Sequence, residues 1–311
     1  MRAVVTGGAG FIGSHLVDAL VARGDDVLVV DDLSTGRRER VHPDARFLQL
    51  DIRDREGVAG AWAADRPEVC FHLAAQADVR VSVADPARDA EVNVLGTINV
   101  LQASHDHETQ LVFSSTGGAI YGECEEPAPE TAPREPISPY GTSKLAGEEY
   151  LAMANRLYGE GHVALRFGNV YGPRQDPHGE AGVVAIFFGR LLEGQPPRIF
   201  GDGSQTRDYV YVGDVVQATL SAAGHAGGVF NVGTGVETSV VDLAAACMRV
   251  SAVEFEPVFE PARLGELQRS VLDSALSERE LGFRAAVALE AGLAETWRSV
   301  SPEGVEAAGA K

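Results

Sequence analysis

The sequence predicts an α/β fold in which a doubly wound parallel sheet is followed by a smaller C-terminal α/β region. In the first half of the chain, short β-rich runs alternate with helical patterns, as expected of βαβ units with helices on both faces of a sheet. A glycine-rich turn joins the first run to the first helix. From Gly172 onward the elements are shorter and richer in Gly and Pro. We therefore assign residues 1–171 to one domain and 172–311 mainly to a second, with the chain free to cross back over that boundary.

The individual elements follow from their apolar patterns. The first helix is expected at Phe11–Ala22, where apolar residues recur along one stripe. Five prolines within Glu123–Pro139 exclude a long helix there. The expected strands are Arg2–Thr6, Val27–Val30, Arg46–Leu50, Val69–Leu73, Gln110–Phe113 and Val163–Phe167. The further expected helices are Arg55–Ala64, Ala87–Ser104, Tyr140–Tyr158, Ala181–Glu193, Val215–Ala223 and Val240–Val250.

The bulk composition excludes several classes of partner. The 311-residue chain carries a formal charge of −19, which repels polyanions and makes nucleic acid a poor partner. No apolar run approaches the roughly 18 residues that cross a bilayer, and the first apolar stretch does not resemble a signal peptide, so no membrane is expected and the cytoplasm is the expected compartment. The three cysteines are widely spaced and form no cluster with histidine, so neither a disulfide framework nor a metal site is expected.

The glycine-rich turn predicts a dinucleotide-binding site. Gly7, Gly10 and Gly13 lie three residues apart between a strand and a helix, so the backbone can approach a pyrophosphate without a Cβ in the way. The helix N-terminus then supplies N–H groups and the positive end of a dipole. A purely structural turn would also use glycine, but the βαβ context favours a Rossmann-type cofactor site.

The end of the second strand favours NAD over NADP. Asp31 lies 18 residues after Gly13, where a carboxylate accepts hydrogen bonds from the adenosine ribose and repels a 2′-phosphate. Asp31 could instead only cap the strand end, and Arg37 and Arg38 nearby keep NADP open. The next two strand ends complete the expected cofactor edge, with the adenine near the first of them: Asp51-Ile52 and His72-Leu73-Ala74-Ala75.

Tyr140 and Lys144 form the pattern that most directly predicts catalysis. On a helix, residues four apart share a face, so the Lys144 ammonium is expected beside the Tyr140 phenol, where it favours the phenolate. Tyr140 is then a candidate base near neutral pH. Thr116, at the end of the fifth strand, is expected to hold the reacting oxygen. The alternatives are an exposed helical pair and strand-end hydroxyls satisfied by neighbours, the second of which fits Ser115 and Ser114 better than Thr116.

Several motifs together resemble one known family. They are VTGGAGFIGSHL, the acidic pair DD, FHLAAQ, NVLGT, FSST, SPYGTSK, RFGNVYGPRQDP, RDYVYVGDV and NVGTG. Over nearly its whole length the chain resembles the extended short-chain dehydrogenase/reductase family of nucleotide-sugar enzymes, and is most similar to the UDP-hexose 4-epimerases. The resemblance implies tightly held NAD and a UDP-sugar substrate. It also implies that Tyr140 takes the proton of the sugar 4-hydroxyl while C4 gives a hydride to NAD, and that the keto sugar turns its other face before the hydride returns.

The resemblance also implies which residues bind each ligand, with Thr116, Tyr140 and Lys144 as the catalytic set. The implied NAD-binding residues are Gly7, Gly10, Phe11, Ile12, Gly13, Asp31, Asp32, Ser34, Thr35, Gly36, Asp51, Ile52, Leu73, Ala74, Ala75, Gln76, Asn93, Ser114, Tyr140, Lys144, Phe167 and Val170. The implied substrate-binding residues are Thr116, Tyr140, Asn169, Val183, Phe200, Arg207, Tyr209, Arg263, Glu266 and Ser270. The two arginines are expected on the diphosphate, and the glutamate on the uridine ribose.

Two glycines separate this chain from relatives with other activities. The resemblance places an Asp-Glu pair after the threonine in sugar-nucleotide 4,6-dehydratases and a Glu in decarboxylases, whereas Gly117 and Gly118 stand here. Water elimination needs a positioned acid, and Glu123 lies too far along the loop to supply it, so a dehydratase is disfavoured. A UDP-glucuronate decarboxylase or another oxidoreductase of the family remains the alternative. A non-catalytic NAD sensor is disfavoured because it would not need the catalytic set.

The resemblance leaves the sugar open and implies a homodimer. In relatives the position of Ser270 gates the sugar pocket, and a small residue admits N-acetyl sugars. UDP-GlcNAc and UDP-glucuronate therefore stand beside UDP-glucose and UDP-galactose as candidate substrates. Relatives dimerise through a four-helix contact, which the helices expected at 87–104 and 140–158 would form here.

Overall fold

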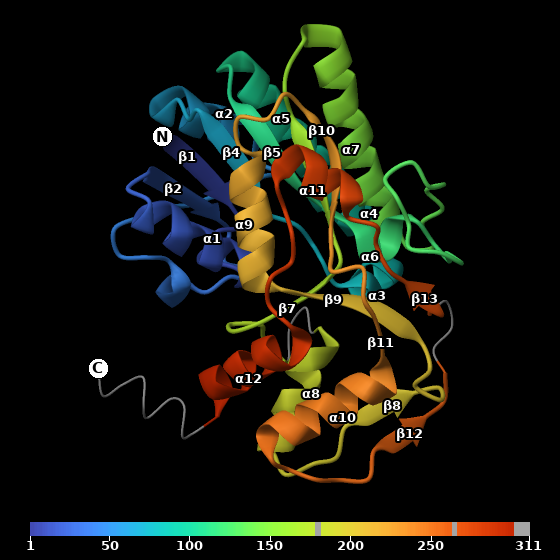
Figure 1. Cartoon of the computed structure of the whole chain (residues 1–311). Coiled ribbons are helices and arrows are strands. Elements are labelled where there is room, and N and C mark those ends of the chain that lie inside the picture. The colour runs from blue at the N-terminus through green and yellow to red at the C-terminus, as the bar shows by residue number, and fades with distance from the viewer. Residues whose placement is uncertain (178–181, 263–265, 302–311) are drawn as a thin grey trace.

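A seven-stranded parallel sheet forms the centre of this computed structural model, which describes residues 1–177, 182–262 and 266–301 (Figure 1). Its strands are β1 (Arg2–Thr6), β2 (Asp26–Asp31), β3 (Arg46–Gln49), β4 (Val69–His72), β5 (Gln110–Thr116), β6 (Val163–Phe167) and β10 (Gly228–Val232). They follow the order β10-β6-β5-β4-β1-β2-β3, and each neighbouring pair is parallel. The chain runs outward from β1 in both directions, which confirms the predicted doubly wound α/β fold.

Helices cover both faces of this sheet, and each face has its own apolar core. One core lies beneath α1 (Phe11–Ala22), α9 (Val212–Ala222) and α11 (Ala275–Leu281). The other lies beneath α2 (Arg55–Asp65), α5 (Thr97–Asp106) and α7 (Pro139–Tyr158). Apart from the edge strand β3, the parallel strands are largely buried on both sides, which explains their nearly continuous runs of Val, Leu and Phe.

The helix predicted at 87–104 is a composite of three segments. It begins as α4 (Pro86–Ala90), widens into the π-helical turn η2 (Glu91–Gly96) and continues as α5. Gly96 allows this turn to pack closely, because a Cβ there would lie 2.6 Å from Ile52 Cδ1. The remaining short helices of the large part are η1 (Arg38–Arg40), α3 (Val79–Ala84) and α6 (Gly117–Ile120). Within the described ranges, no helix is long and apolar enough to cross a bilayer.

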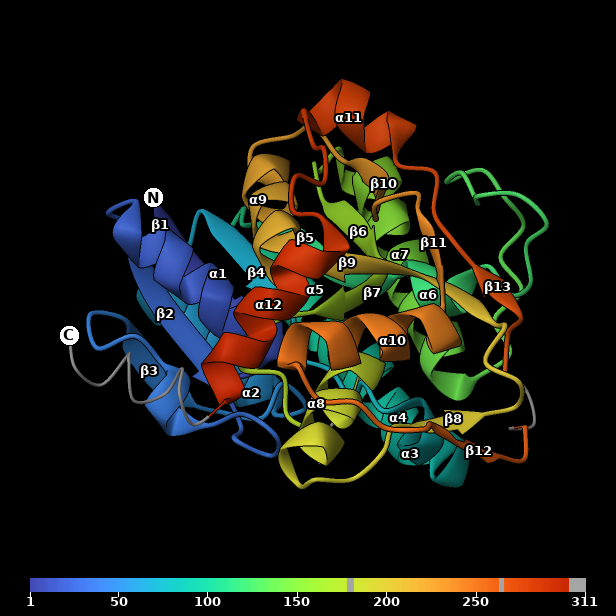
Figure 2. The same ribbon diagram turned by 60° about the horizontal axis from the view of Figure 1, so that its bottom comes forward.

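A smaller part of the molecule lies beyond the carboxyl ends of the sheet strands, at the bottom of Figure 1 and toward the viewer in Figure 2. Its helices are α8 (Val183–Leu192), α10 (Val240–Ser251) and α12 (Leu289–Val300), which share a third apolar core with β9. Its strands are β7 (Asn169–Tyr171), β8 (Arg198–Phe200), β9 (Thr206–Tyr211), β11 (Glu237–Ser239), β12 (Val258–Glu260) and β13 (Arg269–Ser270). β9 pairs with β7, β11 and β13, whereas β12 pairs with β8.

The chain crosses between the two parts more than once. After β9 it returns as α9, which packs on α1, and as β10, which pairs with β6 at the edge of the main sheet. It then leaves for β11 and α10, and it returns again as α11 beside β10. The assignment of 172–311 to the smaller part stays a prediction, with residues 212–232 and 275–281 as the segments that cross back.

Candidate active site

The glycine-rich turn between β1 and α1 is a backbone cradle. Gly7 has a φ of +70°, and a Cβ on this residue would lie 2.6 Å from the backbone nitrogen of Ala74. A Cβ on Gly13 would lie 2.1 Å from the carbonyl oxygen of Gly7. Gly10 precedes α1, and no described side chain caps that helix. The first N–H groups of α1 are therefore available to an anionic ligand.

A cavity opens beside this turn, at the carboxyl ends of β1, β2, β4 and β5. The residues predicted to bind NAD line it, with the exceptions of Gly36, Gln76, Asn93 and Val170. Sequence reasoning did not identify a further set of lining residues, namely Val30, Leu50, Ala77, Val92 and Ser115. Because most of these carry no polar side-chain atom, only their neighbourhood to the predicted residues could have indicated them.

The four exceptions have different surroundings. Gln76 and Asn93 are hydrogen-bonded to each other, with Gln76 N donating to Asn93 Oδ1 at 2.9 Å and Asn93 Nδ2 donating to Gln76 O at 2.8 Å. Gly36 lies against Asp31, since a Cβ there would be 2.6 Å from Asp31 Oδ1. Val170 lies in β7. A direct contact of these four residues with NAD stays a prediction.

Asp31 links the end of β2 to the glycine-rich turn. Its Oδ2 accepts from Ala9 N at 3.0 Å, and its Oδ1 accepts from Leu33 N at 2.8 Å. Burial raises the pKa of this carboxyl, and the Asp32 charge adds to that, although the two backbone hydrogen bonds oppose the shift. A carboxylate oxygen has two lone pairs, so Asp31 can hold the turn and still accept from a ribose hydroxyl.

The two arginines that kept NADP open have other partners. Arg37 Nη2 lies 2.5 Å from Asp176 Oδ2, across to the segment that follows β7. The Arg38 guanidinium lies over the Phe47 ring, 4.5 Å from its centroid. Because both guanidinium groups are engaged in this way, neither is an obvious partner for a 2′-phosphate near Asp31. This favours NAD over NADP.

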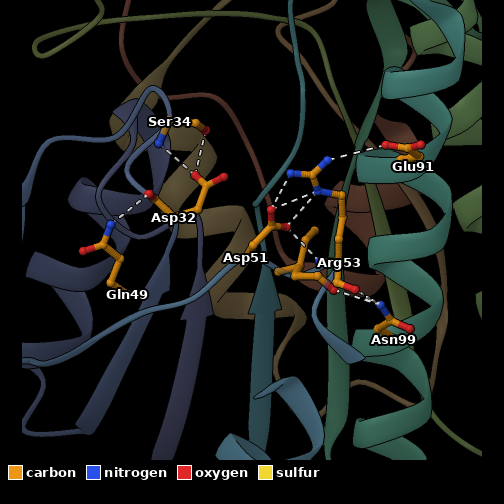
Figure 3. Close-up of polar contacts among 8 residues, drawn as sticks. Asp32, Ser34, Gln49, Asp51, Arg53, Glu91 and Asn99 are labelled. Carbon is orange, nitrogen blue, oxygen red and sulfur yellow. Dashed lines mark hydrogen bonds and ion pairs between the residues drawn. The ribbon is translucent and has the colours of Figure 1, made fainter. Parts of the chain in front are cut away.

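The end of the cavity where adenine is predicted is braced by residues that sequence reasoning missed (Figure 3). Arg53 Nη2 donates to Asp51 Oδ2 at 2.6 Å, and this pairing lowers the pKa of Asp51. Asn99 Nδ2 donates to the carbonyl oxygens of Ile52 and Arg53, at 3.0 and 3.2 Å. Arg53 stands two residues after Asp51, a spacing that could have indicated the ion pair. The loop that carries Asp51 and Ile52 is thus fixed from both sides.

The predicted catalytic pair, Tyr140 and Lys144, lies near the start of α7. Ser138 caps this helix through a hydrogen bond from Gly141 N, and Pro139 occupies its first turn. Tyr140 and Lys144 both line the cavity. The Lys144 side chain is buried, its Nζ donates to Ser114 O at 2.8 Å, and it lies 4.7 Å from the centre of the Phe113 ring. An exposed helical pair is therefore excluded for Lys144.

The hydroxyl groups at the end of β5 have distinct partners. Ser114 Oγ donates to His72 O at 3.1 Å, and Ser115 Oγ donates to the buried Glu148 on α7. Thr116 is the last residue of β5 and is buried. Thr116 does not line the cofactor cavity. Two residues further on, a Cβ on Gly118 would lie 3.4 Å from Asn169 Oδ1. Thr116 and Asn169 therefore belong to the same corner, on the side of the smaller part.

The sheet around β9 brings most predicted substrate residues together. Asn169 on β7 is in register with Tyr209 on β9, and Arg207 on β9 is in register with Ser270 on β13. Arg207 Nη2 lies 3.7 Å from Glu266 Oε1. Gln205, which sequence reasoning missed, donates from Nε2 to Phe200 O at 2.9 Å and to Glu266 at 3.5 Å.

Three predicted substrate residues lie elsewhere or cannot be placed. Tyr209 is 5% exposed within the core between α8, α10 and β9, and among the described residues its hydroxyl has no hydrogen-bond partner. Val183 is half-buried at the start of α8. Arg263 lies outside the described residues. A substrate contact by each of them stays a prediction.

Comparison with known proteins identifies the family of this chain. The pattern of the NAD dependent epimerase/dehydratase family matches residues 3–233. The chain belongs to that family. UDP-glucose 4-epimerase of Mycolicibacterium smegmatis is 50% identical over 305 residues, which is 95% of this chain and 97% of the relative. Two solved structures of UDP-glucose 4-epimerases are 48% identical and cover 96% of this chain and 98% of theirs: one from Thermotoga maritima with UDP-glucose, TM-score 0.94, and one from Thermus thermophilus with NAD, TM-score 0.91.

The surroundings of Gly117 and Glu123 bear on the dehydratase and decarboxylase alternatives. A Cβ on Gly117 would lie 2.5 Å from Leu272 Cδ1, so Leu272 fills the space that a side chain would need. Glu123 is also engaged elsewhere, because its carboxylate accepts from Gln268 N at 2.8 Å and from Arg269 N at 2.7 Å. It fixes the start of β13 and has no contact with Thr116 in the described structure. Neither position supplies an acid beside the catalytic set.

Proposed function

We propose that this protein is an NAD-dependent 4-epimerase that interconverts UDP-glucose and UDP-galactose. One observation carries the proposal: Tyr140 and the buried Lys144 line the same cavity as the glycine-rich turn. That places a candidate acid–base group beside a cofactor cradle, in a chain about half identical to a UDP-glucose 4-epimerase over nearly its full length. The NAD-binding and substrate-binding roles of individual residues are part of this proposal.

The cofactor cavity fits NAD. Gly7 and Gly13 leave no room for a Cβ, so the backbone is open to a pyrophosphate, and Asp31 stands where an adenosine ribose would lie. When bound, NAD accepts a hydride from C4 of the sugar and returns it to the opposite face. Because the cofactor returns to its starting state, the cavity needs to retain it through many turnovers.

The chain supplies the proton chemistry. Tyr140 takes the proton of the sugar 4-hydroxyl at its phenolic oxygen and later returns it. Lys144 keeps a positive charge at the base of the site, held by Ser114 O on β5. Thr116 holds the reacting oxygen from the end of β5. The hydrogen bond to Ser114 fixes the lysine in one place, so its charge is already directed before substrate binds.

The residues around β9 hold the nucleotide. Arg207 supplies charge for the diphosphate, and Glu266, held by Arg207 and Gln205, accepts from the uridine ribose. Phe200 packs on the uracil. Ser270 is small and buried, which leaves room for UDP-GlcNAc beside the simple hexoses. A UDP-glucuronate decarboxylase remains the second candidate, and the glycines at 117 and 118 argue against it.

The enzyme is proposed to be a homodimer of the cytoplasm. Tyr150, Met153 and Leu157 form an exposed apolar stripe on α7, and Leu95 on the adjoining η2 is 55% exposed. Such a stripe on a charged surface is the kind of patch that a second copy covers. The unpaired thiols of Cys70 and Cys247 suit a reducing compartment.

A substrate panel tests the activity. We expect purified protein to invert C4 of UDP-glucose and UDP-galactose without net change in absorbance at 340 nm, resolved by chromatography of the products. Loss of CO₂ from UDP-glucuronate would instead support the decarboxylase. No turnover on any of these sugars would leave an NAD-binding protein without this activity.

The Tyr140→Phe variant tests the assigned base. We expect it to lower turnover by roughly 10²–10⁴-fold, because the phenolic proton acceptor is removed, while the content of bound NAD stays as in the wild type. Cofactor released by heat and assayed enzymatically gives that content. Near-normal turnover in Tyr140→Phe would exclude Tyr140 as the base.

A further inference from the structure

Asp89 on α4 is a carboxylate with no solvent exposure and, among the described residues, no ion pair. It accepts three hydrogen bonds from neutral side chains. Ser143 Oγ donates to Oδ2 at 2.6 Å, and Asn93 Nδ2 and Gln76 Nε2 donate to Oδ1 at 2.9 and 3.0 Å. A buried charge is costly unless its hydrogen bonds are complete, so all three donors are needed at once.

The three donors come from three separate elements that form the cofactor cavity. Gln76 lies in the loop after β4, Asn93 lies in η2, and Ser143 lies in α7. None of the three lines the cavity, nor does Asp89. Their immediate neighbours do line it, and these are Ala75, Ala77, Val92 and Lys144. The network therefore forms a supporting layer directly behind the cavity wall.

Each element is held at two points. The loop after β4 is fixed by Asn93, which bonds both the N–H and the carbonyl of Gln76. The first turn of α7 is held from the sheet by Lys144 and Ser114, and from α4 by Ser143 and Asp89. Among the hydrogen bonds of the described residues, those of Asp89 link the loop directly to α7.

We propose that Asp89 is a positioning residue that holds the Tyr140–Lys144 turn of α7 in register with the cofactor loop 73–77. A Leu at this position has nearly the same shape but accepts no hydrogen bond, so all three donors lose their acceptor. The turn and the loop then move independently. The catalytic half of this inference rests on the proposed function, whereas the cofactor half does not.

Single variants separate the two halves. We expect Ser143→Ala to lower kcat on UDP-glucose by roughly 10- to 100-fold, because small misplacements of a catalytic group have effects of this size, with KM and NAD content unchanged. Ser143→Thr keeps the hydroxyl and should restore kcat. Asn93→Ala should weaken NAD affinity about fivefold to tenfold, because it removes hydrogen bonds that hold the loop. Asp89→Leu should produce both effects.

A double variant and a stability control complete the test. Asp89→Leu combined with Ser143→Ala should have the same kcat as Asp89→Leu alone, since both changes remove the same contact between residues 89 and 143. Val100→Ala, in the core beneath α5, serves as a variant with lowered Tm whose kcat and NAD affinity stay normal. Wild-type kcat in Ser143→Ala, or losses in all variants that merely follow Tm as in Val100→Ala, would overturn the inference. If the wild type turns over no UDP-sugar, the proposed function fails, and the NAD affinities of Asn93→Ala and Asp89→Leu still decide the cofactor half.

Discussion

Gly13 and Gly60 are both helical glycines, yet their surroundings differ completely. A Cβ on Gly13 would enter the glycine-rich turn, 2.1 Å from the oxygen of Gly7, whereas a Cβ on Gly60 in α2 would have nothing within 4 Å. At the first position the missing side chain creates the cradle. At the second it only leaves the helix with a residue of poor helical propensity.

Alanine at the two positions should therefore have opposite effects. We expect Gly13→Ala to abolish NAD retention and to lower Tm, because the backbone of the turn must shift. Gly60→Ala should instead raise the free energy of unfolding by about 0.5–1 kcal/mol with NAD content unchanged. Cofactor content and urea unfolding measure the two outcomes. Retention of NAD by Gly13→Ala would contradict the assignment of the turn.

His72 is part of a continuous series of hydrogen bonds beneath the cofactor cavity. Ala74 N donates to Thr6 Oγ1, which pairs with His72 Nδ1 at 2.6 Å, and His72 Nε2 pairs with Thr97 Oγ1 at 3.0 Å. Thr97 in turn donates to Asn93 O. These partners suit a neutral imidazole, and burial together with the Lys144 charge lowers the pKa of His72 to about 3.

This histidine should make the fold acid-sensitive. The unfolded chain protonates His72 below about pH 6.5, whereas the native state keeps it neutral, so acidification favours unfolding. Between pH 7.5 and 5.0 this one group should remove about 2 kcal/mol of stability. Urea unfolding of the wild type and of His72→Gln at both pH values measures the effect. The variant should lose about 2 kcal/mol less over that interval, and equal losses would show that His72 protonates freely in the native state.

At the scale of the element, α7 has a buried face and an exposed face, and each has its own contacts or proposed contacts. Its buried face carries Lys144 and Glu148, and Glu148 forms a buried ion pair with Arg166 on β6, 2.6 Å between Nη2 and Oε2. Its opposite face carries exposed Tyr150, Met153 and Leu157. One helix therefore joins the catalytic turn, the sheet and the proposed dimer contact.

A charge on the outer face of α7 should disrupt the dimer. Leu157 is 64% exposed, and Leu157→Lys should convert dimer to monomer, because the ammonium would be buried at the contact. Val236, 61% exposed in the loop between β10 and β11, is the matched control, and Val236→Lys should leave the oligomeric state unchanged. Sedimentation velocity gives both results. A monomeric wild type would contradict the proposed homodimer.

The sequence predicts α7 well and its surroundings poorly, for physical reasons. Ser138, Pro139 and the left-handed Gly159 mark both ends of the helix locally. The hydrogen bonds of Asp89 depend on partners up to 54 residues away, and no local pattern reports them. Strands such as β13, with two residues, and β8, with three, carry too few positions to show alternation. The glycine-rich turn was predictable because its motif needs no distant partner to be recognised.

At the scale of the whole molecule, Asp208 joins the two parts. It is buried on β9, and its carboxylate accepts from Thr234 N at 2.8 Å, Thr234 Oγ1 at 2.6 Å and Gly235 N at 3.0 Å. It also lies 3.4 Å from Leu272 N. Asp208 thus fixes the turn where the chain leaves the main sheet, together with the residue that packs on Gly117.

Replacing this carboxylate should affect substrate more than cofactor. Asp208→Asn turns one acceptor into a donor facing N–H groups, so we expect a loss of about 1–3 kcal/mol in unfolding free energy and a raised KM for the UDP-sugar. Bound NAD should stay, because Asp208 does not line that cavity. Asp106→Asn, on the surface of α5, is the matched control and should change stability by less than about 0.5 kcal/mol. A drop in NAD content with unchanged KM would contradict this role.

The position of β10 at the edge of the main sheet affects how the chain folds during synthesis and which fragments of it can fold. Its partner β6 ends at Phe167, but β10 itself is encoded only at Gly228–Val232. During synthesis β6 therefore waits as an open edge while some sixty residues of other structure emerge, and such an edge can pair with a neighbouring chain. A fragment ended at residue 171 would keep that edge permanently. Residues 1–171 are consequently not a module that can be excised or fused on its own, and a form ended before Gly228 needs β10 supplied from elsewhere.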